Sequence, residues 1–133
     1  MNASQTAVIL VGYQNDYFAK DGILRGVIEP ASSVDAVLSS TMDFLKALAP
    51  TPVTLISTPI ILTPDYRALA SPVGILHAIK ESGAFKAGAA GADDIPELKA
   101  FGKRIEYIGG KVGFNAFAGT TLGDELQRRG IKD

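Results

Sequence analysis

Five consecutive aliphatic residues, Ala7 to Val11, form an apolar run with no polar position, and Gly12 ends it. A strand with one solvent-facing side alternates apolar and polar residues, so an uninterrupted run is typical of a strand that is covered on both faces. Such strands occur mainly in parallel sheets, whose crossover connections place helices on both faces. The run therefore predicts a central strand of a parallel sheet.

The next two segments complete a strand, helix and strand unit. Apolar residues recur at helical spacing between positions 34 and 48, and Ser32 or Ser33 is available as the N-cap. A second buried strand is predicted at Val53–Thr58, after two prolines that end the helix. This spacing predicts a βαβ unit with a right-handed crossover and an α/β fold class.

The rest of the chain predicts shorter elements. They are a helix that starts at Pro72 with Ser71 as its cap, a helix over residues 95–101 capped by Asp93 or Asp94, a strand at Ile105–Ile108, and a helix capped by Thr120 that ends at Gly130. The residues after Gly130 are predicted to lead into another strand. No repeat or linker divides the chain, so residues 1–133 are expected to form a single domain.

The charge pattern excludes several classes of partner. The chain carries 13 basic and 14 acidic residues, its net charge is −1, and the two signs are interspersed, so no basic surface is available for nucleic acid. The first residues lack a charged leader segment, and the apolar run at Ala7–Val11 is too short for a signal core or a membrane span. We therefore expect a cytoplasmic protein with no membrane or nucleic-acid partner.

The residue types also limit the chemistry. The chain has no cysteine, so it offers neither disulfides nor a thiolate. Its single histidine, His77, lies in a short apolar helix pattern. Because zinc sites need three or four donors, a packed or surface histidine is the better interpretation, and we expect neither a metal nor a cofactor.

Polar residues follow two of the predicted strands. Gln14, Asn15 and Asp16 come directly after the first strand, and Lys111 follows the third. In open parallel sheets, ligands bind beyond the carboxyl ends of the strands, so these residues are candidates for a shared site. Two alternatives remain: Asn15 and Asp16 close a turn through backbone hydrogen bonds, and Lys111 is a solvated surface lysine.

Two segments resemble a known family. Residues 7–18 (AVILVGYQNDYF) resemble the opening strand and QND-aromatic turn of the isochorismatase-like (cysteine hydrolase) superfamily. Residues 111–131 resemble its lysine, its (S/N)AF-GT-L motif and the helix that follows. The resemblance implies a three-layer α/β/α fold around a central parallel sheet. Members include isochorismatases, nicotinamidases and N-carbamoylsarcosine amidases.

The same resemblance implies an acyl-transfer site built from an aspartate, a lysine and a cysteine. Lys111 matches the lysine and is the predicted catalytic residue, whereas Gly12 stands where the family has its aspartate. The cysteine would follow the next strand, beyond Asp133, so the chain is expected to be the N-terminal part of such a domain. Asp16, four residues after Gly12, is a candidate replacement for the base.

Three further residues are predicted to bind the substrate. Tyr17 matches an aromatic residue that lines the family's substrate pocket, Gln14 belongs to the same turn, and Asn115 closely follows Lys111. The expected function is hydrolysis of an amide C–N or vinyl-ether bond in a small molecule. For the 133 residues alone, without a thiol, we expect no thiol-dependent turnover.

Two alternatives to this function remain open. A non-catalytic relative would bind a small molecule or a partner through the same segments, and it would cover its open sheet edge by forming a homo-oligomer. Gly12 in place of the aspartate motivates this alternative. A generic α/β domain whose motif matches arise by chance is the other.

Overall fold

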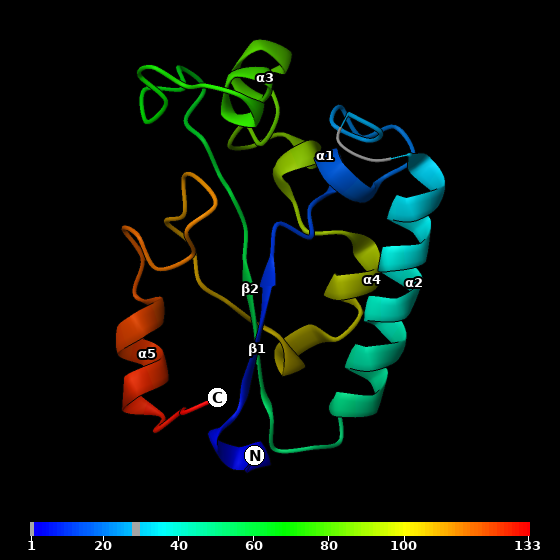
Figure 1. The fold of residues 1–133 in the computed structure, drawn as a ribbon, viewed down its shortest axis with the longest axis vertical. Coiled ribbons are helices and arrows are strands. Elements are labelled where there is room, and N and C mark those ends of the chain that lie inside the picture. The colour runs from blue at the N-terminus through cyan, green and yellow to red at the C-terminus, as the bar shows by residue number, and fades with distance from the viewer. Residues whose placement is uncertain (1, 28–29) are drawn as a thin grey trace.

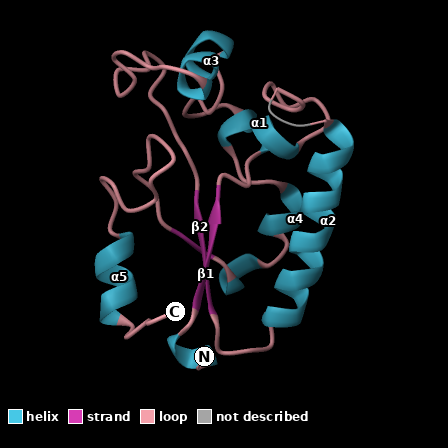
Figure 2. Cartoon of the chain, viewed as in Figure 1, coloured by secondary structure: helices cyan, strands magenta, loops and turns pink. Residues whose placement is uncertain are grey.

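Three parallel strands form the centre of the computed structural model, which describes residues 2–27 and 30–133 (Figure 1, Figure 2). They are β1 (Ala7–Val11), β2 (Thr54–Thr58) and β3 (Glu106–Tyr107), and they lie in the order β1-β2-β3. The register sets Ala7 opposite Thr54, and both strand pairs are parallel. The predicted parallel sheet and α/β class are confirmed.

Helices cover both faces of this sheet. In Figure 1, α2 and α4 lie on one side of the strands and α5 lies on the other. The helices are α1 (Asn15–Phe18), α2 (Ala31–Leu48), α3 (Ile75–Ser82), α4 (Pro96–Lys99) and α5 (Leu122–Arg128), with short 3-10 turns η1 (Ala3–Gln5), η2 (Ala90–Ala92) and η3 (Gly102–Arg104). Within the described ranges, no helix is long and apolar enough to cross a membrane.

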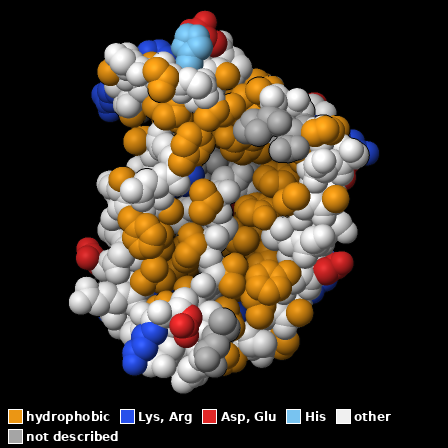
Figure 3. Space-filling view, in the orientation of Figure 1, with side chains coloured by type: hydrophobic (Ala, Val, Ile, Leu, Met, Phe, Trp, Pro, Cys, Tyr) orange, Lys and Arg blue, Asp and Glu red, His pale blue; other side chains and the backbone are white. Residues whose placement is uncertain are grey.

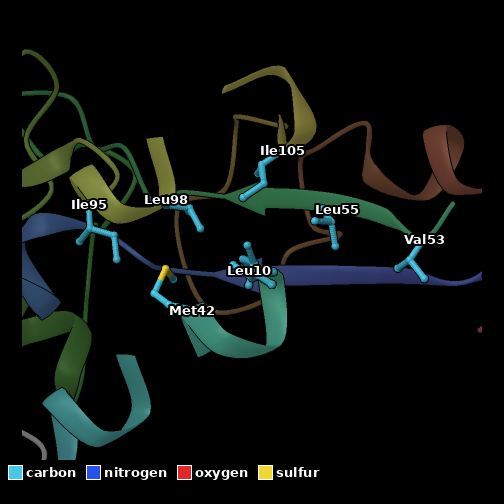
Figure 4. Close-up of a cluster of buried hydrophobic side chains, with 8 residues drawn as sticks. Leu10, Met42, Val53, Leu55, Ile95, Leu98 and Ile105 are labelled. Carbon is cyan, nitrogen blue, oxygen red and sulfur yellow. The ribbon is translucent and has the colours of Figure 1, made fainter. Parts of the chain in front are cut away.

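The core is divided by the sheet because successive strand residues point to opposite faces. Leu10 and Leu55 pack with Met42 and Leu98 beneath α2 and α4 (Figure 4). On the opposite face, Ile56 packs with buried Leu122 of α5, and the partly buried Ile9 joins that cluster. The alternation explains why β1, which has no polar position, suits this fold, and it confirms the three-layer arrangement.

The predicted starts of three helices are wrong. The long helix begins at Ala31 after Pro30, so Ser32 and Ser33 lie inside its first turn and make no cap. The next helix starts after Gly74 rather than at Pro72. Proline and glycine fix these boundaries through their backbone angles: Pro30 has φ −54° and Gly74 has φ +56°, which local side-chain capping patterns do not reveal.

The other two predicted caps have different outcomes. The α4 helix begins after Ile95 without any side-chain cap, so the predicted role of Asp93 or Asp94 is wrong. The predicted cap at α5 is one residue early, because Thr121 holds the N-cap position and makes no side-chain cap. The Thr120 hydroxyl nevertheless accepts a hydrogen bond from the Leu122 N–H at 3.3 Å. Gly130 follows the end of α5 with φ +67°, as the sequence predicted.

One edge of β1 is open. Among the described residues no strand pairs with β1 on the side away from β2, and Val11 at the end of β1 is 46% exposed. The end of the chain hydrogen-bonds to the start of this edge: the Asp133 N–H donates to the Gln5 carbonyl at 3.2 Å, and the Ala7 N–H donates to the Asp133 carbonyl at 2.9 Å. This exchange is the pattern of a parallel bridge opposite Thr6.

The surface along this side of the molecule is strongly apolar. In the space-filling view, hydrophobic side chains gather in a band that runs down the hollow between α5 and α2 (Figure 3). Exposed apolar side chains on α2 include Val37 at 50% and Phe44 at 51%. Contiguous apolar surface of this kind is typical of an interaction site rather than of a solvated face.

Candidate functional site

The carboxyl ends of all three strands meet at one edge of the sheet, because the strands are parallel. The segment Gly12–Phe18 leaves β1 at this edge, and Lys111 lies four residues after the end of β3. The pairing of β2 extends one residue beyond β3, since the Ile108 N–H donates to the Ser57 carbonyl at 3.0 Å. The two motif segments therefore emerge at the same edge, as the sequence predicted.

Lys111 is completely buried, with 0% of its surface exposed. Its Nζ has no hydrogen-bond partner in the described part of the chain, and the Oδ1 of Asp94 is the only other buried side-chain atom found in that state. Burial lowers the pKa of Lys111 from its ordinary value of 10.5 to about 8. The alternative of a solvated surface lysine is therefore wrong.

The stability of the chain should depend on the protonation of Lys111. The pKa of Lys111 is about 8 in the folded protein, and in the unfolded chain it takes its ordinary value of 10.5. Between these pH values the unfolded chain therefore binds more protons than the folded chain. Lys111→Met is expected to be more stable than the wild type below pH 8, and the difference is expected to shrink toward pH 10.5. Urea unfolding of both proteins across this range measures it. A difference that does not change with pH would contradict the lowered pKa of the buried amine.

Gln14 is buried and joins three segments of the chain. Its Nε2 donates to the carbonyls of Ile60 at 2.7 Å and Ala92 at 2.6 Å, and its Oε1 accepts from the Ile60 N–H at 2.8 Å. Both donors of the side-chain amide are thus engaged by backbone groups. Contact between Gln14 and a substrate stays a prediction. Within the protein, the Gln14 side chain links the backbone at Ile60 to the backbone at Ala92.

The two residues after Gln14 also bond to distant backbone. Asn15 donates from Nδ2 to the Ala90 carbonyl at 2.8 Å, and Oδ2 of the buried Asp16 accepts from the Phe85 N–H at 2.7 Å. Neither side chain closes a local turn, so that alternative is wrong. No ion pair joins Asp16 to Lys111 within the described ranges. The role of Asp16 as a replacement base stays a prediction, with Oδ2 held by the Phe85 N–H.

Gly12 and Tyr17 line one cavity of about 420 Å³. The other lining residues are mostly apolar and come from the end of β1, the end of α1 with the segment after it, and the first half of α2: Val11, Phe18, Leu24, Gly26, Ser33, Val34 and Val37. The ring centroids of Tyr17 and Phe85 lie 4.9 Å apart, and burial raises the pKa of the Tyr17 hydroxyl. This volume falls in the range of small-molecule sites.

The backbone at Gly12 differs from what an aspartate would prefer. Its φ is +77°, in the left-handed region that favours glycine over residues with a Cβ. A Cβ built at this position would meet only the Tyr17 ring, at 3.6 and 3.8 Å. The space beside Tyr17 is therefore open, and an aspartate would occupy it only with backbone strain.

Asn115 lies apart from this cavity. It is exposed, and its Oδ1 accepts a hydrogen bond from the Phe117 N–H at 2.9 Å. Its neighbours Phe114 and Phe117 are 54% and 58% exposed. Of the four predicted site residues, only Tyr17 is among the cavity's lining residues, so the structure does not bring Asn115, Gln14 and Lys111 into that lining.

A buried pair at the same sheet edge was missed in the sequence. The Ser57 hydroxyl donates to Oδ2 of Asp94 at 2.8 Å, and burial raises the pKa of the Asp94 carboxyl. The sequence assigned Asp94 to a helix cap. The available signal was the hydroxyl at Ser57, since a polar residue in a strand buried on both faces needs a hydrogen-bond partner.

The residues of this chain do not fit a nicotinamidase-type metal site, which needs an aspartate and two histidines. His77 is exposed on α3. In residues 2–27 and 30–133, no three histidine, aspartate or glutamate side chains come together as a metal site would require.

Comparisons with known proteins place the fold. An isochorismatase-family protein from Desulfovibrio vulgaris has 20% identity and a TM-score of 0.71, over 96% of this chain and 63% of its own. A cysteine hydrolase from Pseudomonas syringae has 19% identity and a TM-score of 0.69, over 98% of this chain and 57% of its own. A nicotinamidase from Bacillus subtilis has 20% identity and a TM-score of 0.68, over 96% of this chain and 67% of its own. No curated protein gives a match.

The three solved structures share the fold of this chain, which spans roughly 57% to 67% of their lengths. The model of the isochorismatase domain family matches residues 6–133 of the chain. That range includes both motif segments, the three strands and the buried Lys111. The chain belongs to the isochorismatase domain family.

Proposed function

We propose that this chain supplies the lysine and part of the ligand site of a hydrolase that acts on a small molecule, at an amide C–N or vinyl-ether bond. The observation that carries the proposal is the burial of Lys111 at the carboxyl edge of the sheet, within the family's lysine motif. Its amine has no hydrogen-bond partner among the residues that the structure describes. A nicotinamidase among the structural relatives supports the amide class.

A buried ammonium group suits the stabilisation of negative charge on a carbonyl or ether oxygen during bond cleavage. Water is excluded from Lys111, so its electrostatic interaction with such an oxygen is stronger than at the surface. The chain has no cysteine to act as nucleophile, and Gly12 supplies no base. In the proposed reaction Lys111 therefore polarises the bond, and other groups attack it.

The missing nucleophile is proposed to lie on polypeptide that follows Asp133 in a longer protein. Two observations support this part of the proposal. Asp133 exchanges backbone hydrogen bonds with Gln5 and Ala7 at the open edge of β1, and the chain spans 57% of the Pseudomonas syringae cysteine hydrolase. A further parallel strand at this edge would end beside Gly12 and the cavity. The domain organisation proposed is a single isochorismatase-like domain, of which residues 1–133 are the N-terminal part.

The second candidate function is non-catalytic binding of a small molecule or partner. It is favoured by the left-handed backbone at Gly12, where the family's aspartate would be strained. In this form the cavity beside Tyr17 would hold the ligand, and a second copy of the chain would cover the apolar band along β1. A cytoplasmic homo-oligomer is proposed in this case.

Removing the Lys111 amine should distinguish the hydrolase function from the binding function. For the longest native form of the protein, assayed with nicotinamide and with isochorismate, Lys111→Ala is expected to lower kcat about 10²- to 10³-fold, which is the usual loss when one charge-stabilising donor is removed. Lys103→Ala, at an exposed lysine with no ion pair in the described structure, is the matched control and should leave kcat unchanged. Absence of turnover in the native form would instead support the binding function.

The 133-residue chain is tested with an alkylating reagent. Without a cysteine it should show no activity that iodoacetamide abolishes. Activity that is lost on alkylation would contradict this expectation and would point to a nucleophile outside the proposed scheme.

A further inference from the structure

The open edge of β1 lacks the features that usually protect an edge strand. Edge strands are commonly blocked by charged side chains, by proline or by a covering element. The residues of β1, Ala7–Val11, include neither a charged residue nor a proline. In the described ranges, Ala7 is the one residue of β1 with a backbone hydrogen bond on that side, to Asp133. The rest of the edge can therefore pair with a further strand.

The strand register shows which backbone groups of β1 face the open side. The Thr54 N–H donates to the Thr6 carbonyl at 3.0 Å, so the even-numbered residues of this segment turn their N–H and C=O groups toward β2. The odd-numbered residues turn theirs to the other side, as the Ala7 N–H does. Ile9 and Val11 thus each present one donor and one acceptor that have no backbone partner in the described structure.

These groups are complementary to those of a second copy of the chain. In an antiparallel pair with Leu10 opposite its own counterpart, Ile9 lies opposite Val11, and the two residues exchange both of their backbone hydrogen bonds. The two-fold axis repeats the exchange on its other side. Asp133, opposite Thr6, lies about 10 Å along the edge from Ile9 and is not displaced.

The α2 helix carries an apolar stripe, Val37 and Phe44, beside this edge. Val37 lines the cavity together with Val11, and Phe44 lies two turns further along on the same side of the helix. Both side chains of the stripe are half-exposed. Met42, between them in the sequence, shares a buried cluster with Leu10. Because a two-fold axis normal to the sheet preserves its two faces, an axis at Leu10 brings this stripe toward the same stripe of the second copy.

The charges near the stripe do not oppose self-association. Both acids of α2 have basic partners: Asp35 pairs with Arg25 at 2.6 Å, and Asp43 pairs with Lys46 at 3.5 Å. In the space-filling view, charged side chains lie mainly around the margin of the apolar band (Figure 3). Association of this face with itself therefore brings together neutralised charge pairs rather than charges of one sign.

The accessible surface of the chain is larger than its mass predicts. A monomer of 13.9 kDa is expected to expose about 6,700 Å² by the general scaling of surface with mass. This chain exposes 7303 Å². The excess of about 600 Å² approaches the ~800 Å² that each partner contributes to a standard protein–protein interface. The extra surface is therefore of the size that one such interface covers.

We propose that two copies of this chain associate through the open edges of β1, in antiparallel register about Leu10, and bury the α2 stripe of Val37 and Phe44 against its counterpart. The parallel sheet of each copy then continues into the other. The proposal rests on the binding function given above, because it names the partner and the pairing of the homo-oligomer, but it requires neither a ligand nor turnover.

Sedimentation equilibrium of the 133-residue chain tests the association. The measured mass should rise from 13.9 kDa toward twice this value as the protein concentration increases. Phe44→Lys should raise the dissociation constant of the dimer at least about tenfold, because it places an ammonium group on both sides of the axis. Val73→Lys, at an 80% exposed residue before α3, is the matched control and should leave the constant unchanged. A mass of 13.9 kDa at every concentration, or equal constants for the two variants, would overturn the proposal.

Amide hydrogen exchange locates the pairing within β1. The amides of Ile9 and Val11 should exchange more slowly as the dimer forms, because they become hydrogen-bonded between the copies. The amides of Val8 and Leu10 face β2 in the monomer and should not change, so they are the internal control. A dimer in which the Ile9 and Val11 amides stay unprotected would overturn the pairing of the edges.

The longest native form of the protein separates this proposal from the hydrolase function. Protection of Ile9 and Val11 in a monomer of that form would show that polypeptide after Asp133 occupies the edge. That result would overturn the proposal and leave the hydrolase function in place. Protection that depends on protein concentration, without turnover of nicotinamide or isochorismate, would support the pairing and remove the hydrolase function.

Discussion

Replacing Gln14 by leucine is expected to destabilise the chain by about 3 to 5 kcal/mol, because three buried hydrogen bonds are lost together. The substitution leaves the Ile60 N–H and the carbonyls of Ile60 and Ala92 without their partner in a buried setting. Leucine is similar in size, so the loss comes from unsatisfied polar groups rather than from a cavity. Urea unfolding monitored by circular dichroism measures the change.

Gln127→Leu is the matched control for this substitution. Gln127 is exposed on α5 and makes no side-chain hydrogen bond in the described structure, so its replacement should change the unfolding free energy by less than about 0.5 kcal/mol. If Gln14→Leu were as stable as this control and lost only ligand affinity, its amide would serve the ligand rather than the fold.

Gly22→Ala is expected to be the second severe substitution, with a loss of about 3 kcal/mol or more. A Cβ at Gly22 would lie 2.4 Å from the Asn15 carbonyl oxygen and 2.7 Å from that of Asp16. Both atoms belong to the backbone of α1, which cannot rotate away as a side chain can. Thermal unfolding should show the loss, together with movement of the segment that carries Tyr17.

Gly113→Ala is the corresponding control. No atom lies within 4 Å of a Cβ built at Gly113, and its φ is not in the left-handed region. Its melting temperature should stay close to that of the wild type. Similar melting temperatures for the two alanine variants would show that α1 does not pack tightly against Gly22.

The parts of the fold that were predictable are those with a strong local signal. Apolar runs placed β1 and β2 within a residue of their observed bounds, and periodic spacing placed the long helix α2. The caps were harder to predict, because several polar residues compete near each helix start. Asp94 illustrates this difficulty: it bonds to Ser57 across the core, 37 residues away, instead of capping α4.

The candidate site was predictable in its residue types but not in their roles. The motif placed Lys111 at the carboxyl edge, and no local pattern indicated that its amine would be buried. Gln14 was expected to face a ligand, yet its amide bonds to Ile60 and Ala92, which lie 46 and 78 positions away. Contacts over such separations depend on how the layers pack.

By itself, the sequence determined the parallel sheet, the family's lysine motif, the absence of a cysteine and the glycine in place of the aspartate. These properties follow from residue identity and from local periodicity, which the unfolded chain already carries. Only the tertiary structure decided that Lys111 is buried, with no partner for its amine in the described part of the chain, and that Gly12 opens a cavity beside Tyr17. The reason is that burial and pairing are properties of the space between elements, which exists only after the helices have packed on the sheet.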